Sequence, residues 1–319
     1  MGKALSREEL EAAHCWEPAD RVPGRPEMTA FRQRARYHQA AWRESRGLPI
    51  GSQPIVPRKG TRSRPVGSRL PLDYARETGA NFLTPAALDA ARIRTSFIEP
   101  HQSLDHQRLW ADLLWSATLA FNLFGDLAAD LGLADRAVHT WWPDAPGTVS
   151  GVLFAHSPGW LDPSYGGNLM AFDAAFVLDL GNGSQGILGV ETRYQERLKP
   201  EKPKPARAPR YRQLAETSGA FASPAIDDLN GRGPLLVMWL EHLLALSMLQ
   251  HPSGTWTWGR LAVIHPAGNV DFDEGCARYG SLLVDRSTFS SMTLEDLLDA
   301  GALPASINRA LRDRYVMAS

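Results

Sequence analysis

Apolar residues recur with helical periodicity in several stretches of the chain. Residues 105–131 carry apolar side chains at helical spacing and predict a long helical segment. Residues 84–94 begin with Thr-Pro, a capping residue followed by proline at the first helical position, which predicts a helix start. Residues 293–300 and 304–316 predict two helices near the C-terminus.

Residues 235–250 form the most apolar stretch, and they predict a buried helix that ends before Pro252. The pair Glu241-His242 interrupts this stretch. We interpret the pair as a polar edge that faces a partner element or a groove.

Shorter apolar runs predict strands. Residues 148–156 and 260–265 form one run each, and Phe172 to Leu180 and Ile187 to Gln195 form two more. The last two runs flank a glycine-rich segment that contains Asn182-Gly183, a strong hairpin signal. The order of helices and strands predicts an α/β (α+β) fold, in which helices cover both faces of a mixed sheet.

The first 70 residues differ from the rest, and we expect an N-terminal arm over 1–70 and a packed domain over 71–319. Ser6 to Glu9 forms a capping box that predicts a short helix, and residues 28–46 are polar, Arg-rich and weakly helical. Residues 51–72 contain four prolines and no acid. The five basic residues of this segment are Arg58, Lys59, Arg62, Arg64 and Arg69. It is either a solvated linker or a strap that lies along nucleic-acid phosphates.

Composition restricts the classes of function. The formal net charge is −1, so a nucleic-acid partner would be held by local basic patches. Cys15 and Cys276 lack the spacing of a zinc site or a disulfide scaffold. The N-terminus is charged and lacks the apolar core of a signal peptide, and the longest apolar run is too short to span a bilayer. We therefore expect a cytoplasmic protein with no membrane partner.

Two carboxylates on the predicted hairpin are the main candidates for chemistry. If the hairpin is centred on Asn182, Asp173 lies directly opposite Glu191 and both side chains point to one face. Mg²⁺ prefers such hard oxygen ligands, and the backbone carbonyl of Thr192 is a candidate third ligand. Arg193 shares the face of Glu191 and is placed to contact a phosphate or the attacking water. This set fits phosphodiester hydrolysis, which needs one or two divalent cations near the scissile phosphate.

A longer ordered set of motifs surrounds these residues. Phe121-Asn122-Leu123-Phe124-Gly125 comes first, then Ala171-Phe172-Asp173, Gly189-Val190-Glu191-Thr192-Arg193-Tyr194 and His265-Pro266-Ala267-Gly268-Asn269. Over roughly residues 70–319, this order resembles the PD-(D/E)XK nucleases, and in particular a bacterial family of restriction endonuclease-like proteins. The resemblance implies a restriction-endonuclease-like fold, with Asp173 and Glu191 as metal ligands and Asn122 near the site.

Arg193 departs from the family pattern, which has Lys at this position. Arginine supplies charge and bidentate phosphate contacts but cannot easily give up a proton. One explanation is drift in a chain in which only five of 34 basic residues are Lys. A second is relocation of the function to Lys199, Lys202 or Lys204. A third is loss of catalysis with retained DNA binding.

A basic, proline-rich segment follows the candidate site. Its six basic residues are Lys199, Lys202, Lys204, Arg207, Arg210 and Arg212. The segment is either a disordered, solvated loop or a flexible clamp that contacts phosphates. Glu196, three residues past Arg193, either reaches the site or faces solvent.

Together these features predict a Mg²⁺-dependent DNA endonuclease of restriction or defence type, with Mn²⁺ as a further candidate ion. One alternative is a catalytically inactive nuclease-fold protein that binds nucleic acid or a protein partner. Another is a hydrolase such as a glycosidase that uses the two carboxylates without a metal. A homodimer is compatible with double-strand cleavage, because many double-strand cutters pair two active sites.

Overall fold

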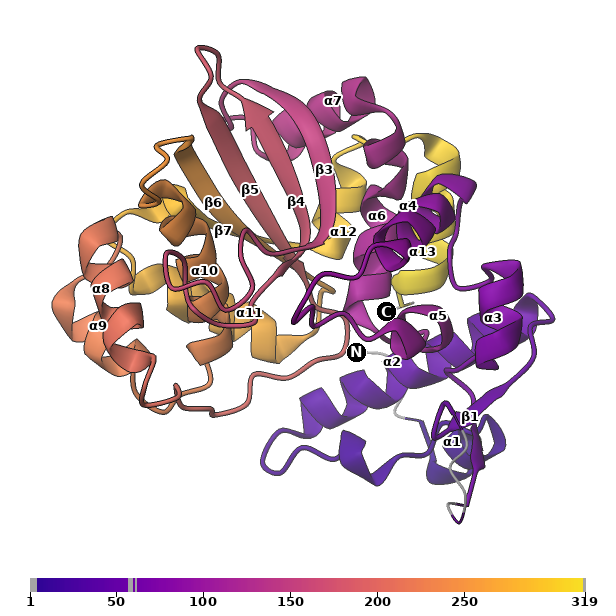
Figure 1. Cartoon of the computed structure of the whole chain (residues 1–319). Coiled ribbons are helices and arrows are strands. Elements are labelled where there is room, and N and C mark those ends of the chain that lie inside the picture. Colours follow the sequence, from indigo (N-terminus) through magenta and orange to yellow (C-terminus); the bar gives the residue numbers. More distant parts are fainter. Residues whose placement is uncertain (1–4, 57–59, 61, 318–319) are drawn as a thin grey trace.

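The computed structural model describes residues 5–56, 60 and 62–317, and a five-stranded sheet lies at its centre (Figure 1). The strands are β3 (Thr148–His156), β4 (Phe172–Asp179), β5 (Gln185–Thr192), β6 (Trp256–His265) and β7 (Phe289–Thr293), in that spatial order. The pairs β3–β4 and β4–β5 are antiparallel, whereas β5–β6 and β6–β7 are parallel. The predicted mixed sheet is therefore confirmed.

Helices cover both faces of the sheet, as predicted (Figure 1). Ala174, Phe176 and Val190 point into one core, which includes residues of α4 (Pro85–Ser96), α6 (Ser116–Ala129) and α7 (Leu131–Trp141). The C-terminal helices α12 (Leu294–Asp299) and α13 (Ala305–Tyr315) belong to the same core. Ala175 and Ile187 point into a second core. It includes residues of α8 (Ala208–Ser218), α9 (Ser223–Leu229), α10 (Leu236–Leu249) and α11 (Val270–Ser281).

The β4–β5 hairpin has the predicted register. Its residue pairs run from Asp179 with Gln185 to Ala174 with Val190, and all are symmetric about Asn182. Asn182 and its glycine neighbours adopt positive φ angles, which explains the Asn-Gly sequence of the turn. Strand β5 ends at Thr192, earlier than the expected Gln195, so Arg193 lies one residue past the strand.

Most predicted helices are present. Ser6 and Glu9 form the capping box of α1 (Arg7–Ala12), and Thr84 caps α4. The single segment expected over 105–131 is instead two helices, α5 (His106–Ala111) and α6. The interruption lies at Asp112, whose backbone is extended and whose side chain accepts a hydrogen bond from the Leu114 amide at 3.1 Å. The side-chain bond competes with helix continuation.

The N-terminal residues are more ordered than the sequence indicated. Helix α2 (Pro26–Ser45) packs against α11 and α13, and its Gln39 donates to the Tyr194 hydroxyl at 3.1 Å and to the Arg314 carbonyl at 2.7 Å. Residues 51–72, for which a solvated linker and a strap were the two alternatives, contain the paired strands β1 (Gly51–Gln53) and β2 (Arg64–Val66). Arg58 and Lys59 lie outside the described residues, and the division of the chain at residue 70 stays a prediction.

The remaining elements are α3 (Leu72–Thr78) and the short 3₁₀ turns η1 (Pro18–Asp20) and η2 (Arg286–Thr288). Among the described residues, none of the helices combines the length and the apolar character needed to cross a bilayer.

Candidate active site

The two candidate carboxylates meet at the end of the β4–β5 hairpin, on the face covered by α10. The ladder register, extended by one residue beyond Ala174 and Val190, sets Asp173 opposite Glu191. The Oδ2 atom of Asp173 accepts from the Thr192 amide at 3.0 Å and lies 2.9 Å from the Thr192 hydroxyl. The pairing of Asp173 with Glu191 follows the predicted register, and Thr192 holds Asp173 in place through its amide and hydroxyl.

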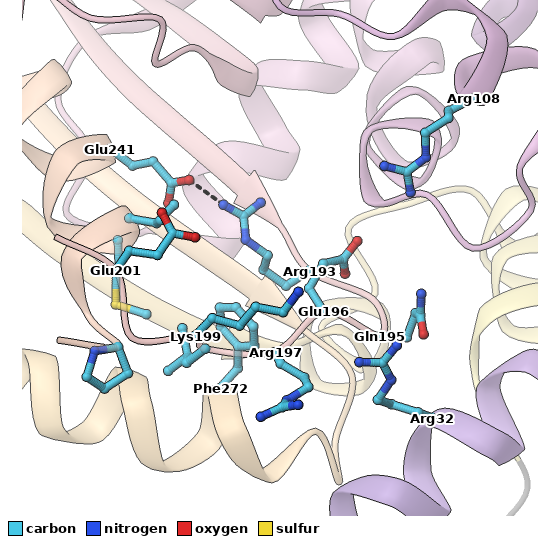
Figure 2. Close-up of a pocket in the computed structure, with 14 residues that line it drawn as sticks. Arg32, Arg108, Arg193, Gln195, Glu196, Arg197, Lys199, Glu201, Glu241 and Phe272 are labelled. Carbon is cyan, nitrogen blue, oxygen red and sulfur yellow. Dashed lines mark hydrogen bonds and ion pairs between the residues drawn. The ribbon is translucent and has the colours of Figure 1, made fainter. Parts of the chain in front are cut away.

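Arg193 lies among these oxygen atoms. Its Nη1 atom donates to Glu191 Oε2 at 3.0 Å and to the Thr192 carbonyl at 2.9 Å, and it lies 3.5 Å from Asp173 Oδ2. Its Nη2 atom pairs with Oε1 of Glu241 on α10, the contact marked in Figure 2. The three oxygen atoms predicted to hold a metal thus converge on one nitrogen of the guanidinium.

Burial controls the ionisation of this cluster. It raises the pKa values of both Asp173 and Glu191. The nearby negative charges of Glu241 and Asp173 raise the pKa of Glu191 further. Burial also raises the pKa of Glu241 to about 7, against the attraction of Arg193. Burial disfavours the charge of Arg193, but Glu241 and the other carboxylates outweigh this effect and raise its pKa. One permanent cation thus balances three acids that ionise with difficulty.

Glu241 is the functional candidate that sequence reasoning did not assign. The Glu241-His242 pair was interpreted only as a polar edge of an apolar helix. Glu241 indeed faces a partner element, the segment after β5, but its partner is Arg193. The available signal was an acid within an apolar stretch that predicts a buried helix. Because acids are rarely fully buried unless they are paired, this acid could have been expected to have a charged partner.

The donor set fits a divalent cation. Oε1 of Glu191 is buried and has no hydrogen-bond partner among the described residues, so Arg193, which contacts Oε2, compensates this carboxylate only in part. The described residues contain no group of three or more His, Cys, Asp or Glu side chains arranged to hold a metal ion. The fit therefore depends on two carboxylates and the Thr192 carbonyl, an all-oxygen set of the kind that Mg²⁺ prefers.

A family model described as the PD-(D/E)XK nuclease superfamily matches residues 26–317, nearly the whole chain. The chain belongs to the PD-(D/E)XK nuclease superfamily. No curated protein and no solved structure shows a significant match to it. The matched range starts at α2 and so includes part of the region that the sequence assigned to an arm.

A cavity of about 400 Å³ opens beside the superfamily motif (Figure 2). Arg193 and Glu241 form one side of it, and Arg32 of α2 and Arg108 of α5 approach from the N-terminal helices. Its charged lining also contains Glu196, Arg197, Lys199 and Glu201. Cations thus outnumber acids on its walls, which favours an anionic ligand such as a phosphate.

Asn122 and Glu196, the accessory candidates, have mainly structural contacts. Asn122 of α6 accepts from the Leu83 amide at 2.7 Å and donates to the Asn81 carbonyl at 3.1 Å and the Tyr315 hydroxyl at 2.8 Å. Within the described residues, none of these bonds reaches the two carboxylates. Glu196 lines the cavity, but its Oε2 accepts from the Tyr194 amide at 2.7 Å. Their participation in the site stays a prediction.

The basic segment after the motif is not a loop throughout, because α8 begins at Ala208. Arg207 is the N-cap residue of α8, Arg210 donates to the carbonyls of Ser164 and Tyr165, and Arg212 pairs with acidic residues. Lys202 and Lys204 are exposed in the preceding coil, whereas Lys199 lines the cavity. The alternative of a disordered loop therefore does not hold for residues 208–212, and DNA binding by these six residues stays a prediction.

Proposed function

We propose that the protein is a divalent-metal-dependent nuclease that hydrolyses phosphodiester bonds in DNA, with Mg²⁺ or Mn²⁺ as its ion. One observation supports this most strongly. Oδ2 of Asp173, Oε2 of Glu191 and the Thr192 carbonyl oxygen all face one point, at 2.9–3.5 Å from the nitrogen that lies there. In the proposal these three groups hold the metal.

A bound divalent cation would supply the Lewis acidity that makes water a nucleophile at neutral pH and that neutralises charge on the phosphate. Residues of the chain would position the metal ligands and bind the substrate. Thr192 holds Asp173 through its amide and hydroxyl. Burial beneath α10 keeps water away from Glu191, and this strengthens its electrostatic interactions. Arg193 keeps its proton, so its role is to bind phosphate oxygens through its planar fork.

The cavity beside the site would receive the substrate backbone. Arg32, Arg108, Arg197 and Lys199 supply positive charge along its walls, and phosphates are bound mainly by such charge. The choice of DNA follows the resemblance to restriction endonuclease-like proteins. A restriction or defence role in the cytoplasm, with two copies acting together on a duplex, completes the proposal. Membership of a nuclease superfamily leaves the glycosidase alternative without support.

A catalytically inactive protein that binds nucleic acid is the second candidate, and Arg193 favours it. The superfamily motif ends in Lys, whereas here Arg contacts all three predicted metal ligands. A chain that had lost catalysis could keep this ion pair and still bind phosphates in the cavity.

A plasmid-nicking assay with Mg²⁺ or Mn²⁺ tests the proposed activity. Wild type should nick the plasmid, and Asp173→Ala and Glu191→Ala should abolish nicking. Glu77→Gln changes an exposed acid of α3 and is the matched control, so it should keep wild-type activity. Equal activity in wild type and both alanine variants would refute the assignment of the site.

Arg193→Lys separates the two candidates. If Arg replaced Lys by drift, both forms should cleave DNA with Mg²⁺, and the Lys form should be the faster because it restores the superfamily residue. Absence of cleavage by both forms, with DNA binding intact in a gel-shift assay, would favour the inactive protein and overturn the nuclease proposal.

A further inference from the structure

The guanidinium of Arg193 is bound by four acceptors of the protein itself. Nη1 contacts Asp173, Glu191 and the Thr192 carbonyl, while Nη2 pairs with Glu241. The exposed fractions are 14% for the Arg193 side chain, 3% for Glu191 and 8% for Glu241. Buried guanidinium–carboxylate contacts of this kind are strong and directional.

This position of Arg193 excludes a metal ion from the same point. Mg²⁺ binds its oxygen ligands at about 2.1 Å. Nη1 lies 2.9 Å from the Thr192 carbonyl and 3.0 Å from Glu191 Oε2, so it occupies the point on which these two oxygens converge. A divalent cation at this point would be repelled by the guanidinium across a very short distance. The guanidinium and a divalent cation would therefore compete for this point.

We propose that Arg193 is a displaceable internal cation that closes the metal position in the metal-free protein. Arg193 leaves this position when a divalent cation binds, and Glu241 retains the guanidinium at the wall of the adjacent cavity. This inference rests on the proposed function, because it assumes that Asp173, Glu191 and Thr192 hold the metal. It assigns Glu241 as a positioning residue that acts through Arg193.

The adjacent cavity provides the space for this movement. Arg193 and Glu241 both line it, and its volume of about 400 Å³ accommodates a displaced guanidinium. A guanidinium that turns into the cavity while bound to Glu241 approaches the region where Arg197 and Lys199 would hold substrate phosphates. The same movement that opens the metal position thus brings Arg193 to the phosphate.

Mn²⁺ binding measured by calorimetry without DNA tests the displacement. Removing the competing cation with Arg193→Met should lower the dissociation constant by about tenfold or more, as expected if the open state of wild type is about 10% populated or less. Arg193→Lys should give a smaller gain, because a compact ammonium holds fewer acceptors at once. This second variant keeps the test valid if Arg193→Met does not fold.

Arg278→Met is the matched control, because Arg278 is an exposed arginine of α11 that does not line the cavity. It removes one positive charge and should leave Mn²⁺ affinity within about twofold of wild type, because water screens charges that are not in contact. An equal gain for Arg278→Met and Arg193→Met would show only a general charge effect and would overturn the displacement.

Glu241→Gln tests the positioning role. It weakens one anchor of the guanidinium and should therefore tighten Mn²⁺ binding by a few-fold. A weaker affinity in this variant would mean that Glu241 itself binds the metal, and would overturn its assignment as a positioning residue.

Glu191→Ala distinguishes failure of the inference from failure of the proposed function. If Glu191→Ala binds Mn²⁺ as wild type does, the proposed metal site is wrong. If wild type binds Mn²⁺, Glu191→Ala does not, and Arg193→Met and Arg193→Lys both match wild type, the metal site stands and the displacement is refuted.

Discussion

Replacing Glu241 by Gln should change how the stability of the metal-free protein depends on pH. Burial raises the pKa of Glu241 from 4.5 to about 7. Between these two pH values the folded state binds more protons than the unfolded state, so the free energy of unfolding decreases as pH rises. Each pKa unit corresponds to about 1.4 kcal/mol, so the full effect is about 3 kcal/mol.

Urea unfolding in EDTA between pH 5 and pH 8 measures this effect. Over this range wild type should lose about 2 kcal/mol more than Glu241→Gln, because the amide has no proton to release. The raised pKa values of Asp173 and Glu191 keep some pH dependence in both proteins. Glu44→Gln, at an exposed position of α2, is the control and should follow wild type.

The result that would refute this reasoning is simple to recognise. If wild type and Glu241→Gln lose stability in parallel from pH 5 to pH 8, then Glu241 is already ionised at low pH. In that case the attraction of Arg193 outweighs the cost of burial.

Three further substitutions probe the surroundings of the site. Thr192→Val removes the hydroxyl that lies 2.9 Å from Asp173 Oδ2, and it should lower the free energy of unfolding by about 1–3 kcal/mol and weaken Mn²⁺ binding. Asn122→Ala should cost about 2–3 kcal/mol because it leaves buried partners unsatisfied, with Mn²⁺ affinity unchanged. Gly189→Ala should cost about 1–3 kcal/mol or more, because the added methyl group would overlap the Phe172 ring.

Each of these substitutions has a control variant or an outcome that would contradict it. Thr192→Ser keeps the hydroxyl, so it should retain Mn²⁺ affinity, and a loss equal to that of Thr192→Val would contradict the assignment of the effect to the hydroxyl. For Asn122, weakened Mn²⁺ binding in a folded variant would instead place its amide in the metal site. Gly151→Ala adds a methyl group to β3 with ordinary contacts only, so a thermal midpoint as low as that of Gly189→Ala would contradict the steric argument.

The sheet could be predicted from the sequence because its signals are local. The Asn-Gly turn fixes the hairpin register, and apolar runs fix its two strands. Strand β7 was missed because Phe289–Thr293 is short and polar, and its parallel pairing with β6 depends on a distant part of the chain. Helix α2 was underestimated because its buried positions, such as Phe31 and Gln39, lie among many polar and arginine residues and form only a weak apolar pattern.

The site could be predicted only in part for a related reason. Asp173, Glu191 and Arg193 lie on one hairpin and its continuation, so their proximity follows from the spacing of residues along the strands. Glu241 reaches them from a helix that lies about fifty residues further along the chain. Its contact with Arg193 depends on how α10 packs on the sheet, which no local pattern encodes.

The arginine among the carboxylates also bears on how the protein is made. A protein in which only a bound metal compensated the charge of its buried acids would fold at a rate and with a yield that depend on the supply of that ion. Arg193 is covalently present in every copy at a fixed ratio, so partial charge compensation is available as soon as the hairpin closes. If the proposed metal site is correct, folding of the chain would not depend on the supply of the ion, because Arg193 supplies the compensating charge.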